Sequence, residues 1–331
     1  MDLDAFVAEH ASSWRRLEKL AARRRKLSAD EADELVALYQ RTATHLSLVR
    51  SRSPDPALVA RLSRLVLAGR GALTGTPLRL WASVSRFFTE SFPAAVYRAL
   101  PWWAGTGLAF IAVTGWLIVH YASHPADVLQ FVSQEDVDDL VNTSFEAYYR
   151  QAAPQNFAFA VWTNNAQVAA VCLASGVLLL PVLLMLFLNA FNTGLVGGVM
   201  VGNGRADTFF GLLLVHGMLE LTAIFVAAGV GLRIGWSWIA PGPTRTRGQA
   251  LAEAGRSGMV VALGLAVVLL VSGVVEAFVT PYLPIPVGLV IGGTVWIAFL
   301  AYVTVFGRVA AAAGRTGDLL EDDREASVPT A

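Results

Sequence analysis

Long apolar runs dominate the chain between Trp102 and Arg308, and only short polar stretches interrupt them. The run from Gly105 to Ala122 holds His120 as its one charge-capable side chain, and residues 166–202 contain no Asp, Glu, Lys or Arg. A helix needs roughly 20 apolar residues to cross a hydrocarbon core about 30 Å thick. The pattern therefore predicts several transmembrane helices, and any chemistry must operate in lipid.

Six spans follow from apolar length and from breaks at Gly, Pro and charged residues. They are predicted at about residues 102–122, 158–179, 182–202, 208–232, 258–280 and 286–307. The second and third are joined through Gly176 to Pro181, a stretch too apolar for an ordinary loop. Residues 158–202 therefore have three interpretations: two full spans in a tight hairpin, a broken or re-entrant helix, or one long kinked helix.

Residues 1–76 have a different pattern, in which apolar positions recur at helical spacing between charged ones. The apolar positions are Phe6, Trp14, Leu17, Leu20, Leu35, Leu38, Leu46, Val49, Leu58, Leu62, Leu65 and Leu67. Ser28 with Glu31 three residues later is a capping box that begins the second helix. We predict a small cytoplasmic helical bundle. The basic run 23–26 is interpreted as a solvated face near anionic lipid, and no motif indicates nucleic-acid binding.

Residues 77–101 alternate large apolar side chains with arginines, a composition typical of a helix lying in the membrane interface. The alternative is a helix packed on the N-terminal bundle. Pro101-Trp102-Trp103 marks the entry into the bilayer, because indoles favour the headgroup region. The first span follows directly.

Charge distribution predicts the orientation. The chain is 55% hydrophobic and 15% charged, and with six spans and an internal N-terminus 23 of its 25 Lys and Arg fall on the cytoplasmic side. A five-span arrangement would put the basic loop 233–257 and the basic N-terminal region on opposite sides. We therefore predict an all-α polytopic protein with both termini in the cytoplasm. Its parts are the bundle 1–76, an amphipathic interfacial helix 77–101, a transmembrane domain 102–308 with an acidic extracytoplasmic segment 123–157, and an acidic tail 309–331.

The sharpest chemical signal is His216-Gly217-Met218-Leu219-Glu220, whose ionisable pair lies one helical turn apart on a shared face. Asn189 and Asn192 of the third span lie at a similar predicted depth. We expect these four side chains to form an intramembrane polar cluster. Three roles stay open for it: hydrogen bonding between helices, proton or ion handling, and catalysis.

Secondary polar and packing positions complete the predicted set. Asn164 and Asn165 open the second span, where capping or interfacial hydrogen bonding is expected, and Glu276 is expected near the outer interface. Two Gly-x-x-x-Gly pairs favour close helix packing: Gly194 with Gly198, where the third and fourth spans should touch, and Gly288 with Gly292, which also suits dimerisation.

Familiar catalytic motifs are missing from the sequence. It contains no His-Glu-x-x-His, no phosphate-binding loop and no Gly-x-Ser-x-Gly elbow. His216 and Glu220 supply two ligands where zinc needs at least three, so we predict no metal and no cofactor. Cys172 is the single cysteine, which excludes an internal disulfide. An enzyme is therefore not favoured.

Several motifs in order resemble the stage II sporulation protein M family, over about residues 79–230 and more loosely beyond. They are Phe92-Pro93, Asn164-Asn165, Gly176, Asn189, Asn192-Thr193-Gly194, His216-Gly217-x-x-Glu220 and Gly229. Thr193 departs from the pattern, because an uninterrupted Asn-Gly would be the closer match.

The resemblance implies a polytopic protein of the bacterial inner membrane. Sporulation members of the family act at the septum with a lytic transglycosylase and an amidase and have no established catalysis. The expected function is a non-enzymatic organiser of peptidoglycan-remodelling machinery, with segment 123–157 as the docking site. Expected partners are lipid, other membrane or envelope proteins and, in a homo-oligomer, further copies of the chain. The alternatives are a transporter or ion-coupled permease component using the His–Glu pair and an intramembrane hydrolase.

Overall fold

The computed structural model describes residues 3–23, 27–52, 55–73, 80–150 and 152–318. Regular structure in these ranges is helical and includes no strand, so the prediction of an all-α protein is confirmed. Six helices are long and apolar enough to cross a membrane, as predicted. Three predicted features fall outside the described residues: the basic residues 24–26, the start of the interfacial helix at 77–79 and the acidic tail from 319.

The chain divides into two compact units, Met1–Ser83 and Val84–Ala331. The N-terminal unit contains α1 (Leu3–Ala22), α2 (Ala29–Arg52) and α3 (Pro56–Leu73). Its core is formed by apolar residues from all three helices, namely Trp14, Leu17, Leu20, Leu35, Leu38, Val49, Leu58, Leu62 and Leu65. Ser28 and Glu31 form the predicted capping box, with hydrogen bonds of 3.1 and 3.2 Å. Leu67 differs from the prediction, because it is 68% exposed.

Residues 80–98 form α4 (Leu80–Arg86), the π-helical turn η1 (Phe87–Ser91) and α5 (Phe92–Arg98). Trp81 is 86% exposed, whereas α5 is buried in the second unit and packs against α14. Gly307 of α14 lies directly against the Pro93 backbone, and Tyr302 donates a 2.5 Å hydrogen bond to the Phe88 carbonyl. The second half of the predicted interfacial helix is therefore part of a helical core, which neither sequence interpretation anticipated.

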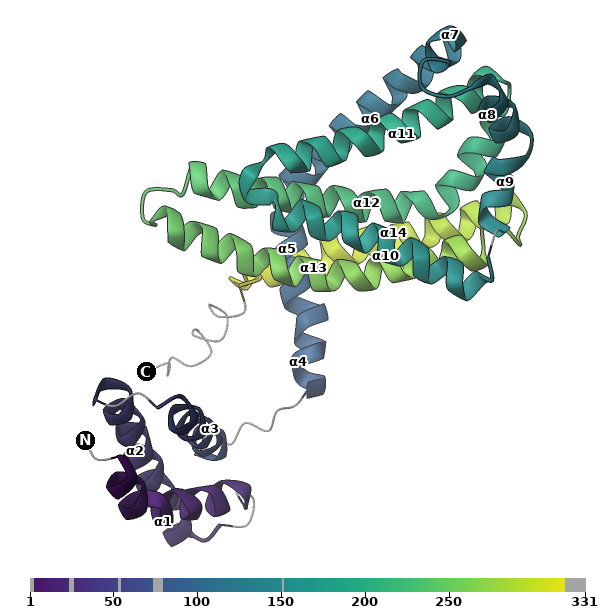
Figure 1. The fold of residues 1–331 in the computed structure, drawn as a ribbon. Helices are drawn as coiled ribbons and strands as arrows, with labels where there is room; N and C mark the ends of the chain where they lie inside the picture. Colours follow the sequence, from purple (N-terminus) through teal and green to yellow (C-terminus); the bar gives the residue numbers. More distant parts are fainter. Residues whose placement is uncertain (1–2, 24–26, 53–54, 74–79, 151, 319–331) are drawn as a thin grey trace. The chain divides into compact units, whose positions relative to one another are not determined.

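The second unit contains the six long helices (Figure 1). They are α6 (Leu100–Ser123), α10 (Pro154–Ala174), α11 (Leu180–Gly202), α12 (Ala206–Ile239), α13 (Arg247–Phe278) and α14 (Ile285–Ala312). Every residue of α12 from Thr222 to Gly231 is buried. A helix that is buried on all faces lies at the centre of a bundle. Helix α12 accordingly contacts α6, α10, α11, α13 and α14.

The apolar link between the second and third spans is a sharp turn. Helices α10 and α11 contain 21 and 23 residues, and each is therefore about 30 Å long. The short helix η4 (Gly176–Leu178) and Leu179, with φ of 59°, reverse the chain between them. A Cβ on Gly176 would lie 2.4 Å from the Gly231 carbonyl oxygen, so glycine lets the turn press against α12. Of the three interpretations, the hairpin of two full-length helices is correct.

Helices α12 and α13 are longer than their predicted spans. They contain 34 and 32 residues, which corresponds to about 50 Å each against a hydrocarbon core of about 30 Å. The extra residues lie at the end of α12, which reaches Ile239, and at the start of α13, which begins at Arg247. Depth counted from the first residue of α13 is therefore misplaced.

Residues 124–150 connect α6 to α10 and are called the connecting segment below. It contains α7 (Pro125–Val128), α8 (Gln134–Asp139), η2 (Leu140–Ser144), α9 (Phe145–Ala147) and η3 (Tyr148–Arg150). Figure 1 shows it running from the end of α6 past the start of α12. Val128 and Val137 are buried in a cluster with Tyr121 and Val199 of the long helices. The segment is therefore folded onto the helical bundle rather than forming a simple loop.

Candidate functional site

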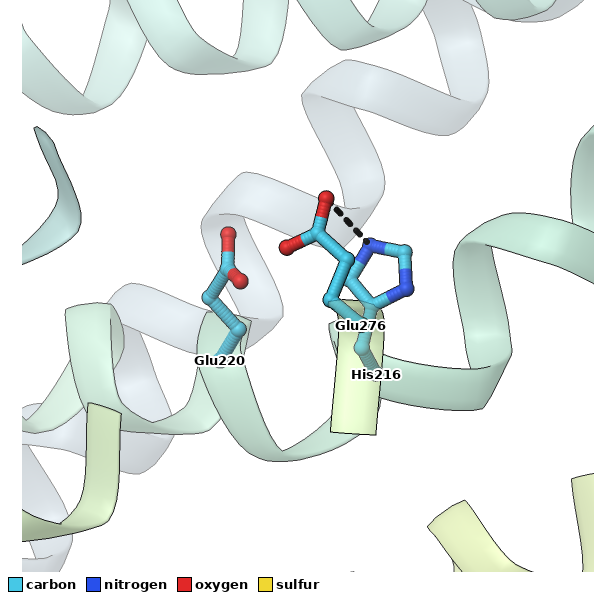
Figure 2. A group of neighbouring side chains, drawn as sticks. All are labelled: His216, Glu220 and Glu276. Carbon is cyan, nitrogen blue, oxygen red and sulfur yellow. Dashed lines mark ion pairs between the residues drawn. The ribbon is translucent and has the colours of Figure 1, made fainter. Parts of the chain in front are cut away.

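Three ionisable side chains meet inside the second unit: His216 and Glu220 of α12 and Glu276 of α13 (Figure 2). His216 Nε2 lies 3.8 Å from Glu276 Oε1. One donor atom from each of the three residues lies within 4.8 Å of the other two. His216 is 5% exposed and Glu276 is 4% exposed. The sequence-predicted His–Glu pair is thus part of a buried His–Glu–Glu site.

Helix packing places these side chains. His216 and Glu220 are one turn apart and share a face of α12. On α13, Ser272 and Glu276 have the same spacing, and Ser272 Oγ donates to the His216 carbonyl at 3.3 Å. Thr280, in the turn after α13, places Oγ1 3.3 Å from His216 Nδ1. The imidazole is therefore held at Nδ1, while its Nε2 faces the carboxylates.

The carboxylates are only partly satisfied. Asn165 and Ser272 are side-chain hydrogen-bonding neighbours of Glu220. Glu220 Oε2 is nevertheless buried without a hydrogen-bond partner. Within the described residues, Glu276 makes no hydrogen bond either, and its contact with His216 at 3.8 Å is longer than a hydrogen bond. Buried polar atoms nearly always have a hydrogen-bond partner, so these unpartnered oxygens indicate a binding site for another group.

A cavity of about 440 Å³ reaches the two carboxylates from the face of α10. Tyr148, Asn156, Asn164 and Asn165 line it together with the two glutamates. Asn156 and Asn164 are exposed, so the cavity opens on that face. A cavity of mixed polar and apolar lining therefore leads from the protein surface to the two carboxylates.

Tyr149 of η3 packs beside the imidazole of His216, with ring centroids 5.8 Å apart. Burial, together with the nearby charge of Glu276, raises the pKa of the Tyr149 hydroxyl. The phenol is therefore neutral at physiological pH. It contributes an aromatic wall to the site and no charge.

The four predicted cluster residues have different surroundings. Asn189 Nδ2 donates at 2.8 Å to the Met185 carbonyl of its own helix, and Asn192 is exposed. The neighbours that the structure gives to His216 and Glu220 are Asn165 of α10 and Glu276 of α13. Asn164 lines the cavity, whereas capping or interfacial bonding was expected for both α10 asparagines.

The first of the two Gly-x-x-x-Gly pairs packs on a different helix from the one predicted. Gly194 and Gly198 lie against Leu117 and Tyr121 of α6, and not against the fourth span. Gly288 and Gly292 lie against Val215 of α12, next to His216. A Gly-x-x-x-Gly pair predicts close approach of a helix but does not identify which one.

Glu276 was expected near the outer interface and apart from the His–Glu pair. The structure buries it beside His216, where it also lines the cavity, so its membrane depth stays a prediction. The sequence signal that would have found it is the Ser272-x-x-x-Glu276 repeat, which puts a second polar pair on one face of a neighbouring span. With Glu276 included, three residues can supply metal ligands, so the argument from only two ligands no longer holds.

Comparison with known proteins identifies both units. A family model described as stage II sporulation protein M matches residues 106–281. A model of a domain of unknown function (DUF8413) matches residues 4–75. No curated protein and no solved structure is significantly similar to the chain. The first match covers the helices α6 and α10–α13 and all residues of the buried site.

Proposed function

The chain belongs to the stage II sporulation protein M family, and from this premise we propose that it is a non-enzymatic membrane organiser of cell-envelope machinery. It is a multi-pass membrane protein with six apolar helices. The proposed partners are peptidoglycan-remodelling enzymes outside the cytoplasmic membrane. The proposed orientation places both termini in the cytoplasm and the connecting segment outside.

One observation carries the proposal: the connecting segment is anchored on one side and acidic on the other. Val137 of α8 is buried, and Ser133 and Asp136 form a capping box that fixes its first turn. Arg150 at the far end donates a 2.6 Å hydrogen bond to the Pro281 carbonyl. The exposed carboxylates are Glu135, Asp136, Asp138, Asp139 and Glu146. Fixed carboxylates present a pre-organised surface for a basic partner, which lowers the ordering cost of binding.

Site-specific photocrosslinking in living cells tests the organiser function. A photoreactive residue at Asp139 should capture a peptidoglycan-cleaving enzyme, identified by mass spectrometry. A probe at Val290, an exposed apolar residue of α14, is the control and should not capture it. The substitutions Glu135→Lys and Asp138→Lys should reduce capture at least several-fold, because they reverse charge beside the probe. Undiminished capture, or capture of unrelated proteins only, contradicts the proposal.

The cavity favours a second candidate function, an intramembrane hydrolase. It reaches the two carboxylates that lie beside His216, an arrangement suited to metal-assisted hydrolysis. An ion pathway is less well supported, because α12 beyond the site is buried among apolar side chains from Ala223 to Val230. Peptidoglycan-enzyme localisation that survives Glu276→Gln would favour the organiser over the hydrolase. Its loss, with expression and fold retained, would favour the hydrolase.

A further inference from the structure

We propose that His216, Glu220 and Glu276 bind one divalent transition-metal cation of the Zn²⁺ class, with a further coordination position open to the cavity. The site is formed by α12 and α13 and lies apart from the exposed acidic surface of the connecting segment. The inference therefore stands independently of the organiser function.

The donor set fits such an ion. Zinc is bound by imidazole nitrogen and carboxylate oxygen at about 2.0–2.2 Å, which puts tetrahedral ligand atoms about 3.4 Å apart. The observed separation of 3.8 Å between His216 Nε2 and Glu276 Oε1 is close to that value. The ligand atoms, which lie within 4.8 Å of one another, must come closer together. Rotation of the two flexible glutamate side chains, which moves their oxygens by about 1 Å, is sufficient. The imidazole favours a transition metal over Mg²⁺ or Ca²⁺, which prefer oxygen ligands alone.

The charges of the three side chains also favour a divalent cation. Two ionised carboxylates this close together inside a membrane protein repel each other strongly and lose their hydration. A divalent cation with two carboxylates and a neutral imidazole has no net charge. Metal binding therefore removes the electrostatic cost of placing Glu220 and Glu276 side by side.

The unpartnered atoms point to the same ligand. Glu276 is 4% exposed and makes no hydrogen bond within the described residues, and Glu220 Oε2 is also buried without a partner. In Figure 2 the Glu276 carboxylate faces the imidazole, and the Glu220 carboxylate lies on the other side of Glu276. His216 Nδ1 faces Thr280 Oγ1 at 3.3 Å, which leaves the Nε2 lone pair for the ion. Ligating histidines typically use their second nitrogen in this way.

The cavity determines the type of site. Structural zinc sites are closed by four protein ligands, whereas sites with three keep a position for water or a small ligand. Here two of the three donors, Glu220 and Glu276, line a cavity together with Asn165, and His216 lies behind them. Water or a small anion entering from the α10 face can complete the coordination.

Metal counting on the full-length protein in lipid nanodiscs tests the proposal. The protein is stripped with a chelator, equilibrated with Zn²⁺, freed of excess metal and analysed by mass spectrometry of the elements. We expect one Zn²⁺ per chain, not displaced by millimolar Mg²⁺. Glu220→Gln and Glu276→Gln should each weaken binding by about 100-fold or more, because loss of a direct ligand exceeds the 10–100-fold effect of losing a supporting residue.

Glu253→Gln is the matched control, because Glu253 is a half-buried carboxylate paired with Arg245 at the other end of α13. It should bind zinc as the unmodified protein does. Zn²⁺ should also raise the melting temperature of the unmodified protein and of Glu253→Gln, but of neither ligand variant. Substoichiometric zinc in the unmodified protein, or equal zinc in the folded ligand variants, overturns the proposal.

X-ray absorption on the unmodified protein supplies a test that needs no variant. The expected first shell contains nitrogen and oxygen with the outer-ring scattering of one imidazole. A sulfur ligand, or several imidazoles, would contradict the assigned residues. After replacement of zinc by Co²⁺, azide should change the visible spectrum if a coordination position is open. An unchanged spectrum would overturn that part of the proposal.

Discussion

At the scale of single residues, the buried site joins two side chains that are close in sequence to one that is distant. His216 and Glu220 share a face of α12 because one helical turn separates them, and Glu276 reaches them from α13. Spacing along the chain predicts the first relation. It names Glu276 only as a separate polar residue, since the facing surfaces of α12 and α13 are selected by packing along both helices. Asn189 donates to a carbonyl of its own helix, a contact that depth along the chain does not predict.

Thr280→Val should weaken Zn²⁺ binding with little effect on stability. The substitution keeps the shape of the buried side chain but removes the oxygen that faces His216 Nδ1. We expect a loss of about 10–100-fold in affinity, the usual effect of losing such a support, and about 1 kcal/mol or less in unfolding free energy. Competition with a chromophoric chelator measures the affinity.

Thr294→Val is the control for this substitution. Its hydroxyl is exposed and donates to the Val290 carbonyl of its own helix, so both affinity and melting temperature should stay unchanged. Wild-type affinity in Thr280→Val would mean that Thr280 does not orient the imidazole.

The N-terminal unit should lose stability in mild acid. Trp14 Nε1 donates a 3.1 Å hydrogen bond to His45 Nδ1, so the folded state requires that nitrogen to be unprotonated. Burial, and then the charge of His10, lowers the pKa of His45 below its ordinary value of 6.5. The unfolded state therefore takes up the proton first, and stability falls as pH drops below that value.

Hydrogen–deuterium exchange of α1–α3 in the full-length protein measures this effect. Protection should decrease between about pH 7.5 and about pH 5.5, after correction for intrinsic exchange, by an amount on the order of 1 kcal/mol. His45→Gln should make protection nearly independent of pH in this range. His124→Asn, in the connecting segment, should leave the dependence intact. A pH dependence that persists in His45→Gln would assign the effect to other groups.

At the scale of elements, the existence of the six long helices could be predicted, because a chain in lipid must satisfy its backbone hydrogen bonds internally. Their ends could not be predicted, since α12 and α13 continue well beyond the apolar runs. The sequence also did not show which helices pack against each other. Gly194 and Gly198 correctly indicated close approach, but α6 rather than α12 lies against them.

Gly292→Ala should strongly destabilise the second unit. A Cβ at this position would lie 1.7 Å from the Val215 carbonyl oxygen, which is backbone and cannot rotate away. We expect a loss of about 3 kcal/mol or more, the range of severe overpacking. Thermal unfolding in nanodiscs or unfolding in denaturing detergent measures it.

The neighbouring residue is a matched control. At Gly293, a Cβ would meet only the end of Met218 at 3.8 Å. Gly293→Ala should therefore be neutral or stabilising by up to about 1 kcal/mol, because alanine favours helix. Equal effects at the two positions would show that α14 does not pack on α12 at Val215.

At the scale of the whole molecule, the chain divides into two units, Met1–Ser83 and Val84–Ala331. The sequence pattern changes from charged and helical to apolar along the chain, so a division into two parts follows from composition. The position of the boundary between the two units does not follow from composition. Helix α5 has the amphipathic sequence of a surface helix, yet its small residues pack against α14. Burial of a segment depends on the shape of its partner, which its own sequence does not contain.

The orientation in the membrane is tested by cysteine labelling. Asp138→Cys should react with a membrane-impermeant maleimide in intact cells, because residue 138 is exposed and proposed to lie outside. Thr44→Cys, exposed on α2, should react only after the membrane is permeabilised. The natural Cys172 is fully buried, so the unmodified protein provides a low background. The reverse labelling pattern would require the opposite orientation.

Tyr149 gives the connecting segment a direct influence on the buried histidine. The residue belongs to η3, next to the hydrogen bond from Arg150, and its ring packs on the imidazole of His216. The buried Tyr149 ring thus belongs both to the connecting segment and to the surroundings of His216. A protein that displaces η3 on docking would remove this ring from the imidazole without requiring any long helix to tilt or slide.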